Sequence, residues 1–286
     1  MRSRPRTVKQ IIEPRPVTEG AGVRLKRSIG TQSLDYLDPF LLLDHFASTD
    51  PVDYEAGFPL HPHRGIETVT YLLSGAVSHK DTLGNSGTIA AGDVQWMTAG
   101  RGIMHEEMPQ VRPEGIAGFQ LWVNLPAKLK MAEPRYQNIS ASEIPLIKKE
   151  NGVTVRVITG EVDGVSGPVS GIAIAPLYLD VWVPPKTSFV QALDPMHAAF
   201  VYVFEGSAKF SADEKEKKKL IGHPKLVVLG QGDSIDVLTI DDPVRFLLVS
   251  GKPLGEPVAR YGPFVMNTKQ EIEQALLDLQ NGTFVR

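Results

Sequence analysis

The sequence predicts an all-β protein built from two tandem barrels, with an α-helix at the C-terminal end. From residue 60 onward, short runs rich in Val, Ile, Leu and Tyr alternate with glycine-containing turns, which is typical of antiparallel strands. The pattern occurs twice, because residues 69–75 match residues 200–206 and residues 90–95 match residues 230–235. A strand-and-turn pattern that is present in two copies indicates two copies of one fold.

The C-terminal helix is predicted from its caps and its apolar face. Thr268-Lys269-Gln270-Glu271 fits a capping box, and Asn281-Gly282 provides a stop signal. The apolar residues between them share one helix face: Ile272, Ala275, Leu276 and Leu279. We expect this face to pack against one of the barrels.

The domain organisation follows from the chain length and from one change of pattern. A chain of 286 residues is long enough for two separate cores. We expect residues 1–140 to form the first domain and residues 141–286 the second. The boundary is placed there because Pro126 to Ile147 replaces the strand pattern with a short helical turn and a polar segment. The charged run at residues 213–219 is interpreted as a solvated hairpin tip.

The chain before residue 60 gives weaker signals. Val8–Ile12 and Val23–Leu25 are predicted to be short strands. Leu34–Phe46, which is rich in Asp, Pro and Leu, is expected to form a turn followed by a buried strand. The arginines among the first six residues are interpreted as part of a solvated tail.

Composition restricts the function classes. The formal net charge of -3 and the pI near 6.2 give no reason to expect nucleic acid or an acidic membrane as a partner. No apolar run approaches the roughly 18 residues that a membrane span needs, and no hydrophobic segment follows the basic N-terminus to make a signal peptide. We therefore expect a cytoplasmic protein. Because the chain has no cysteine, any metal must be held by His, Asp, Glu or water.

A metal site is predicted from the spacing of two residue pairs. His61 and His63 are two residues apart, so in a strand their side chains point to the same face of the sheet. The same parity holds for His105 and Glu107. Two such strands would present three imidazoles and one carboxylate to one interior. This ligand set suits Fe, Mn, Ni, Cu or Zn, whereas Mg and Ca prefer oxygen ligands.

The second copy of the pattern serves as an internal comparison for the metal site. Aligning the two copies places His61, His63, Glu67 and His105 opposite other residue types: Ala192, Asp194, Ala198 and Arg245. Histidines needed only for packing should occur in both copies. The second domain is therefore predicted to lack the metal ligands.

The motifs of the first copy resemble those of a known family. The order of its key residues resembles the two-part motif of the cupin superfamily: Gly57, His61, His63, Glu67, Gly75, Gly92, Asp93, Gly100 and His105. The longer strings at residues 61–71, 92–102 and 105–109 resemble the pirin family specifically, and the likeness continues at 121–125 and 261–268. It covers nearly the whole chain and implies two cupin, or jelly-roll, barrels.

Some positions depart from the general cupin pattern. Thr98 stands where many cupins have proline, and four residues rather than two separate Gly100 from His105. Most cupins take their carboxylate ligand from the position of Glu67, whereas pirins resemble this chain in placing it at the position of Glu107.

Parity alone leaves Glu67 open as a ligand, but Gly65 favours a bulge that would rotate the residues after it. We therefore expect Glu107 to be the ligand and Glu67 to face the substrate or support the ligands. The alternative is that Glu67 only pairs with Arg64 or Arg101.

The resemblance implies an activity. Pirins are described as iron-binding proteins, and several are quercetin 2,3-dioxygenases that open a flavonol ring with dioxygen. By this resemblance we expect one divalent transition metal, with Fe(2+) first and Mn, Ni, Co, Cu or Zn still open. The substrates would be a small aromatic molecule such as a flavonol plus dioxygen, and Glu107 would act as the catalytic base. A six-coordinate ion with four protein ligands keeps two positions open for them.

The expected substrate-binding residues are chosen from the apolar and polar residues beside the site. They are Glu67, Trp96, Met97 and Phe119, with Phe58, Leu121 and Trp122 as further candidate walls. Each aromatic residue could equally be an ordinary core residue.

Two alternative functions stay open. One is a non-enzymatic, iron-dependent redox sensor or transcription cofactor with a protein partner, as the resemblance to eukaryotic pirins implies. The other is a sugar-phosphate isomerase, for which Arg64 and Arg101 give little support.

Overall fold

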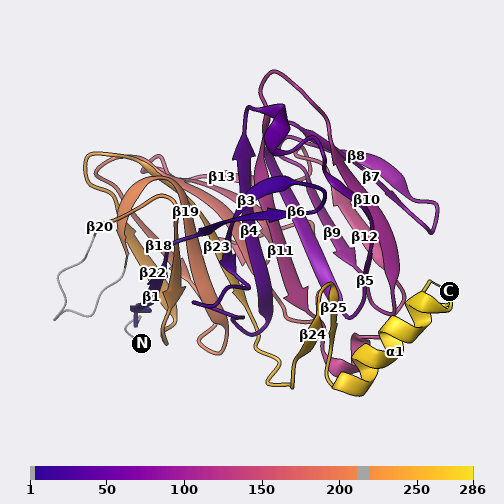
Figure 1. Ribbon diagram of the computed structural model, residues 1–286. Helices are drawn as coiled ribbons and strands as arrows, with labels where there is room; N and C mark the ends of the chain where they lie inside the picture. The colour runs from indigo at the N-terminus through magenta and orange to yellow at the C-terminus, as the bar shows by residue number, and fades with distance from the viewer. Residues whose placement is uncertain (1–3, 211–219, 286) are drawn as a thin grey trace. The chain divides into compact units, whose positions relative to one another are not determined.

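The computed structural model describes residues 4–210 and 220–285 of the chain, so the charged run at residues 213–219 lies outside the described residues (Figure 1). Strands dominate these ranges, and the helix α1 (Lys269–Gln280) follows the last strand. The prediction of an all-β fold with a C-terminal helix is confirmed. Of the helices in the described ranges, none has the length and apolar character that crossing a bilayer requires.

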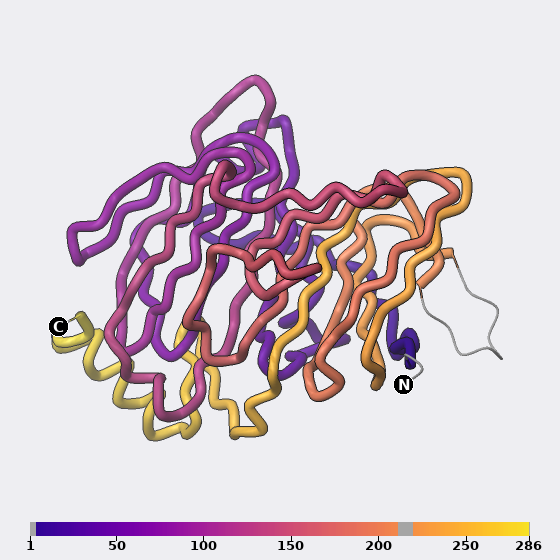
Figure 2. Tube along the Cα trace, turned by 180° about the vertical axis from the view of Figure 1, so that it is seen from behind, coloured from indigo at the N-terminus to yellow at the C-terminus, as the bar shows by residue number. Residues whose placement is uncertain are grey.

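The chain forms two compact units, and each unit combines two separate stretches of sequence. The first unit consists of Arg15–Ala141 and Leu254–Arg286, and the second consists of Met1–Pro14 and Ser142–Pro253. The boundary between the units inside the chain lies between Ala141 and Ser142. The units differ from the expected domains, 1–140 and 141–286, at both ends of the chain. In Figure 2 the yellow C-terminal segment runs beside the strands of the first unit.

The first unit contains two main sheets and a hairpin. The seven-stranded sheet has the order β12-β9-β6-β11-β4-β3-β2, and the four-stranded sheet has the order β5-β10-β7-β8. The strands of the larger sheet are β2 (Arg15–Glu19), β3 (Val23–Ile29), β4 (Phe40–Ser48), β6 (Ile66–Ser74), β9 (Val94–Thr98), β11 (Ile116–Asn124) and β12 (Arg135–Ile139). Those of the smaller sheet are β5 (Phe58–His63), β7 (Ala76–Asp81), β8 (Ser86–Ala90) and β10 (Ile103–Pro109). The hairpin consists of β24 (Ala259–Tyr261) and β25 (Phe264–Met266), and two short 3-10 helices are η1 (Pro51–Asp53) and η2 (Ala127–Leu129).

The second unit contains a ten-stranded sheet whose main path is β1-β21-β19-β23-β17-β14-β13. The strands of the second unit are β1 (Val8–Ile12), β13 (Leu146–Lys148), β14 (Thr154–Thr159), β15 (Glu161–Val162), β16 (Val165–Ser166), β17 (Leu177–Val183), β18 (Ser188–Ala192), β19 (Ala198–Phe210), β20 (Leu220–Gly222), β21 (Lys225–Leu229), β22 (Ser234–Leu238) and β23 (Val244–Gly251). β15 and β16 form a small hairpin of their own.

The N-terminal segment is part of this second fold. β1 pairs with β21, and the side chain of Arg6 is buried, where it donates hydrogen bonds to the carbonyl oxygens of Asp194 (2.7 Å), His197 (2.8 Å) and Gly230 (3.1 Å). The expectation of a solvated arginine tail is therefore wrong for Arg6. A buried guanidinium is tolerated here because carbonyl oxygens accept its protons.

The strand pairing corrects one detail of the alignment between the two copies. In the first unit β5 pairs with β10, and in the second unit β18 pairs with β22. The counterpart of His105 therefore lies on β22, and Arg245, which lies on β23, corresponds to a position on β11. In the second unit the buried positions of this strand pair include Phe189, Ile235 and Val237, which belong to its hydrophobic core. The strand pair that carries three imidazoles in the first unit thus contributes apolar side chains to the hydrophobic core in the second unit.

The C-terminal helix has the predicted caps and face. Thr268 accepts a hydrogen bond from the backbone N–H of Glu271, and the Glu271 side chain accepts one from the backbone of Thr268, which completes the capping box. Ile272 and Ala275 are buried against the hairpin residues Phe264 and Met266. The helix therefore fastens the hairpin β24–β25 within the first unit.

Candidate metal centre

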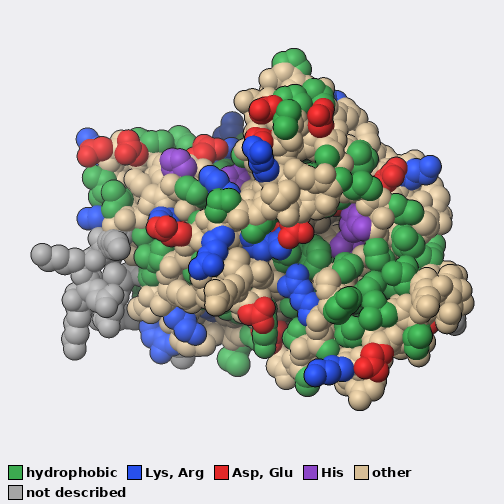
Figure 3. All heavy atoms as spheres, viewed as in Figure 1, with side chains coloured by type: hydrophobic (Ala, Val, Ile, Leu, Met, Phe, Trp, Pro, Cys, Tyr) green, Lys and Arg blue, Asp and Glu red, His purple; other side chains and the backbone are tan. Residues whose placement is uncertain are grey.

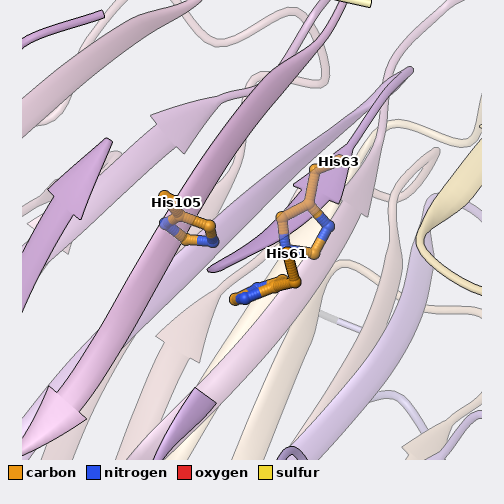
Figure 4. Close-up of side chains that lie close together, drawn as sticks. All are labelled: His61, His63 and His105. Carbon is orange, nitrogen blue, oxygen red and sulfur yellow. The ribbon is translucent and has the colours of Figure 1, made fainter. Parts of the chain in front are cut away.

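Two neighbouring strands of the small sheet bring three histidines together. β5 and β10 are antiparallel, and His61 stands directly opposite His105. His63 lies two residues further along β5, so its side chain points to the same face as that of His61. The ring centres are 4.8 Å apart for His61 and His63, 4.5 Å for His61 and His105, and 5.1 Å for His63 and His105. Figure 4 shows the three rings converging from these two strands.

The three imidazoles form a group that could hold one metal ion. One nitrogen of each ring can be chosen so that all three lie within 4.8 Å of one another. Ligands at about 2.1 Å from an ion lie roughly 3–4 Å apart, so small rotations of the rings would complete a shell. A search of the described residues for three or more His, Asp or Glu side chains with ligand atoms this close together finds His61, His63 and His105.

The hydrogen bonds of His61 select its free nitrogen. Its Nδ1 lies 2.9 Å from the carbonyl oxygen of Pro59. Because a carbonyl oxygen only accepts, Nδ1 must carry the proton, and Nε2 then presents its lone pair. Metal-binding histidines are commonly oriented in this way, by a hydrogen bond from the second ring nitrogen.

The other two histidines carry nitrogens without partners. His105 is fully buried and His63 is 2 % exposed. Within the described residues, three of their ring nitrogens have no hydrogen-bond partner: Nδ1 and Nε2 of His105, and Nδ1 of His63. Buried polar atoms are nearly always satisfied, so such unpaired atoms require an explanation. Burial, followed by the neighbouring imidazoles, lowers the pKa of His105 to about 3 and the pKa of His63 well below its usual range. Both rings are therefore neutral, which is the form that binds a metal, and the donor set fits a metal ion.

Glu107 lies on the same strand face as His105 and contributes to the wall of a cavity beside the histidines. Burial is the main cause that raises the pKa of its carboxyl group, and the nearby His61 and the Thr70 hydroxyl oppose this rise. Thr70 Oγ1 lies 3.1 Å from Glu107 Oε1 and 2.7 Å from the side-chain amide of Gln120. Both of these partners are oxygen acceptors, Glu107 Oε1 and Gln120 Oε1, and the Thr70 hydroxyl has one proton, so it donates to one of them at a time.

Four residues expected to bind the substrate are packed in the interior of the first unit. Glu67 is buried and accepts a hydrogen bond of 2.7 Å from Thr98 Oγ1, and Trp96, Met97 and Phe119 are at most 1 % exposed. None of these four is among the described residues that line the cavity. Burial raises the pKa of Glu67, and the hydroxyl of Thr98 partly offsets this.

The two arginines considered as partners of Glu67 form other ion pairs. Arg64 pairs with Asp278 at 2.7 Å, and Arg101 pairs with Glu133 at 2.5 Å.

The cavity has a volume of about 530 Å³ and is lined by both polar and apolar side chains. Of the further wall candidates, Phe58 and Trp122 line it, and His61, His63 and Glu107 lie in its wall. Cavities of this size are typical sites for small molecules. In Figure 3 histidine side chains (purple) are visible to the right of centre, at the edge of a hollow between hydrophobic side chains (green).

Sequence reasoning missed several groups of this cavity. Arg27 on β3 makes two hydrogen bonds to Asp44, of 2.8 and 2.7 Å, and one of 2.7 Å to Glu19. Arg260, Gly262 and Pro263 of the C-terminal hairpin also line the cavity. The only available signal was the string at residues 261–268, because it belongs to the family resemblance.

His79 was also missed as a neighbour of the site. It lies opposite Glu107 in the pairing of β7 with β10. Burial lowers the pKa of its imidazole.

The hairpin is held close to His63 by tight packing. Gly65 follows the histidine strand with φ +79°, and a Cβ at this position would approach the carbonyl oxygen of Val265 to 2.0 Å. The Nζ of buried Lys130 donates hydrogen bonds to the carbonyl oxygens of Gly65 (2.9 Å) and Val265 (2.8 Å) and to the side chain of Asn124 (2.7 Å). A glycine is required at position 65 because both its conformation and this close approach exclude a side chain.

The two sheet-built units and the histidine cluster in one of them define a two-barrel protein of the cupin class with a candidate metal centre in one barrel. The Pirin family matches residues 22–123, and the Pirin C-terminal cupin domain matches residues 178–285. A pirin-like protein of Caulobacter vibrioides is 45 % identical over 98 % of this chain and 99 % of its own length. The chain belongs to the pirin family, and the predicted fold of two cupin barrels is confirmed.

Two further similarities concern proteins whose names refer to an activity. A Pseudomonas aeruginosa protein, whose name assigns it provisionally to the quercetin 2,3-dioxygenases, is 44 % identical over 98 % of both chains. The crystal structure of a quercetin 2,3-dioxygenase from Acinetobacter baumannii superposes with a TM-score of 0.87 at 34 % identity, covering 98 % of this chain and 99 % of that one.

Proposed function

We propose that this protein is a metal-dependent dioxygenase that cleaves the ring of a flavonol-type substrate, as a quercetin 2,3-dioxygenase does. The observation that supports this most directly is the position of the three clustered imidazoles and Glu107 in and beside the wall of a cavity of about 530 Å³. The similarity to the Pseudomonas protein and to the Acinetobacter enzyme points to the same activity. The proposed substrates are a small aromatic molecule and dioxygen.

The proposed metal ligands are His61, His63, His105 and Glu107, and Fe(2+) is the proposed ion. Imidazoles with one carboxylate bind most first-row divalent ions, so Mn, Ni, Co, Cu and Zn are compatible with the same residues. When bound, the ion would supply a Lewis-acid and redox centre for the substrate oxygen and dioxygen. The unpaired nitrogens of the buried histidines support this assignment, because a metal would give them the partner that they lack.

Glu107 is the proposed catalytic base. Its Oε1 accepts the hydrogen bond from Thr70, so Oε2 is the oxygen that would take the proton of an acidic substrate hydroxyl. A carboxylate whose pKa is raised by burial is a stronger base than an exposed one, and its pKa is closer to neutral pH. The apolar residues of the cavity wall would exclude water while the proton moves.

The decisive experiment measures oxygen consumption and carbon monoxide release when the Fe(II) protein is incubated with quercetin in air. We expect both, in equal amounts, and we expect a Glu107→Gln variant that retains its metal to lose at least 99 % of the rate. Absence of turnover in the Fe, Mn, Ni, Co and Cu forms would refute the enzymatic proposal. A redox-sensing role with a protein partner would then be the function to test. A cytoplasmic location is a further part of the proposal.

A further inference from the structure

The cavity wall contains an arginine, Arg260, for which the described part of the chain provides no ion-pair partner. Arg260 lies on β24 and lines the cavity, where its Nη1 donates a hydrogen bond of 3.2 Å to the carbonyl oxygen of Leu41. Its guanidinium carbon lies 5.1 Å from the centre of the Trp122 ring. Among the described residues no carboxylate forms an ion pair with it, although Asp35, Asp44 and Glu19 act on its charge over a longer range.

The second arginine of the wall is in the opposite situation. Arg27 donates hydrogen bonds to both carboxylate oxygens of Asp44 and to Glu19, so these N–H groups are not available to a ligand. These three charges sum to one negative charge, which would repel an anion. Within the cavity wall, the place that favours an anionic group is therefore the guanidinium of Arg260.

Arg260 is linked to the histidine cluster by one aromatic ring. The Trp122 ring lies 5.2 Å from the His63 ring, edge to face, and 5.1 Å from the Arg260 guanidinium carbon. The cation and His63 are therefore at most about 10 Å apart, a separation that a molecule of two or three aromatic rings can span. An aromatic ligand along this wall would have the histidine cluster at one end and the cation at the other.

We propose that Arg260 is a specificity-determining residue that selects planar aromatic ligands with an anionic group, a carboxylate or phenolate, at the end remote from the metal centre. The guanidinium is pre-positioned by Trp122 and by the Leu41 carbonyl, so little side-chain entropy is lost when it binds the anion. A charge-assisted hydrogen bond at the rim of the site would add to the affinity without touching the reacting atoms. The inference rests on the proposed function in one respect, because it places the chelating end of the ligand at the metal.

The test compares two ligands that differ only at the remote end. These are 3-hydroxyflavone and its 4′-carboxylate derivative, and their dissociation constants are measured without oxygen on the metal-containing protein. The dissociation constant of the wild type should be at least about tenfold lower for the carboxylate derivative than for 3-hydroxyflavone, because a hydrogen bond to a charged group contributes free energy of this order. Arg260→Met should remove this preference and change the affinity for 3-hydroxyflavone less than threefold. Arg260→Lys should retain part of the preference, because it keeps the charge but not the planar geometry.

A matched control removes one positive charge elsewhere in the same unit. Arg24 is an exposed residue of β3 that does not line the cavity, so Arg24→Met should leave the preference unchanged. If Arg260→Met lowers the affinity for both ligands by the same factor, Arg260 only supports the position of Trp122. This result would overturn the proposal. A wild type without preference would overturn it as well. The binding assay contains no oxygen, so it does not depend on turnover. If the wild type prefers the carboxylate in this assay but cleaves no ring in air, the proposed function is refuted and the role of Arg260 in binding stands.

Discussion

The ammonium group of Lys130 is joined to the carbonyl oxygen of Val265 by a hydrogen bond of 2.8 Å, although 135 residues separate them in sequence. The same ammonium also binds the carbonyl of Gly65, next to the histidine strand. Its third acceptor is the side-chain oxygen of Asn124. One buried lysine thus connects the metal-site strand, the large sheet and the C-terminal hairpin.

Lys130→Met should lower the free energy of unfolding by about 2–4 kcal/mol, because it leaves three buried oxygen acceptors without a donor. Urea unfolding followed by circular dichroism measures this loss. The matched control is Lys128→Met, which changes an exposed lysine two residues away and should have an effect near zero. Equal effects of the two substitutions would contradict the structural role of the buried ammonium.

Lys130 also makes stability depend on pH in a defined range. Burial lowers its pKa to about 8, whereas a lysine in the unfolded chain titrates near about 10.4. Between these values the unfolded state binds a proton that the folded state does not, so raising the pH favours the folded state. The difference in unfolding free energy between wild type and Lys130→Met should therefore increase from pH 8 to pH 10. A difference that is flat or falls over this range would disagree with a lowered pKa.

His63→Ala and His105→Ala should each abolish metal binding while the fold remains. Each removes one of three clustered imidazoles, and the smaller side chain creates space without adding charge. Elemental analysis should show metal content at least tenfold below that of the wild type, with an unchanged circular dichroism spectrum. His223→Ala, an exposed histidine of the second unit, is the control and should keep its metal. Full metal content in either site variant would mean that the ligand set is wrong.

Thr70→Val should raise the pKa of Glu107 further. The hydrogen bond from Thr70 lowers this pKa, and valine has a similar shape but no proton to donate. Under the proposed function, the acid limb of the pH–rate profile should shift to higher pH, and the rate below that limb should fall about tenfold. Thr70→Ser, which keeps the hydroxyl, should leave the limb in place. An unchanged profile in Thr70→Val would show that this hydrogen bond has no part in the chemistry.

The sequence was sufficient to predict the histidine cluster because strand parity is a local rule. His61 and His63 share one face by their spacing alone, and His105 joins them through the pairing of two strands. The capping box of the last helix is equally local, and its prediction is confirmed. These features depend on residues a few positions apart or on neighbouring strands.

The residues that line the cavity were harder to predict, because apolar character alone does not show which side chains of a strand point into the cavity. All five residues of β9 are buried, so the apolar character of Trp96 and Met97 fits either face. Gly65 interrupts the chain between β5 and β6, so parity counted from His63 does not carry over to Glu67. Arg260 and Pro263 line the cavity although they lie about 200 residues after its histidines in the sequence. No local sequence pattern predicts a contact between residues so far apart.

The hairpin that completes the cavity has a consequence for how the protein is made. Ser142–Pro253 must be synthesised between Arg15–Ala141 and Leu254–Arg286, which takes on the order of ten seconds at typical ribosomal rates. During that interval the nascent chain already carries His61, His63 and His105 but lacks Arg260, Gly262 and Pro263. Under the proposed function, a metal ion that binds before residues 254–286 have been synthesised would occupy an incomplete cavity, where chelators could remove it. Stable metal binding would therefore require the C-terminal hairpin to have folded onto the site.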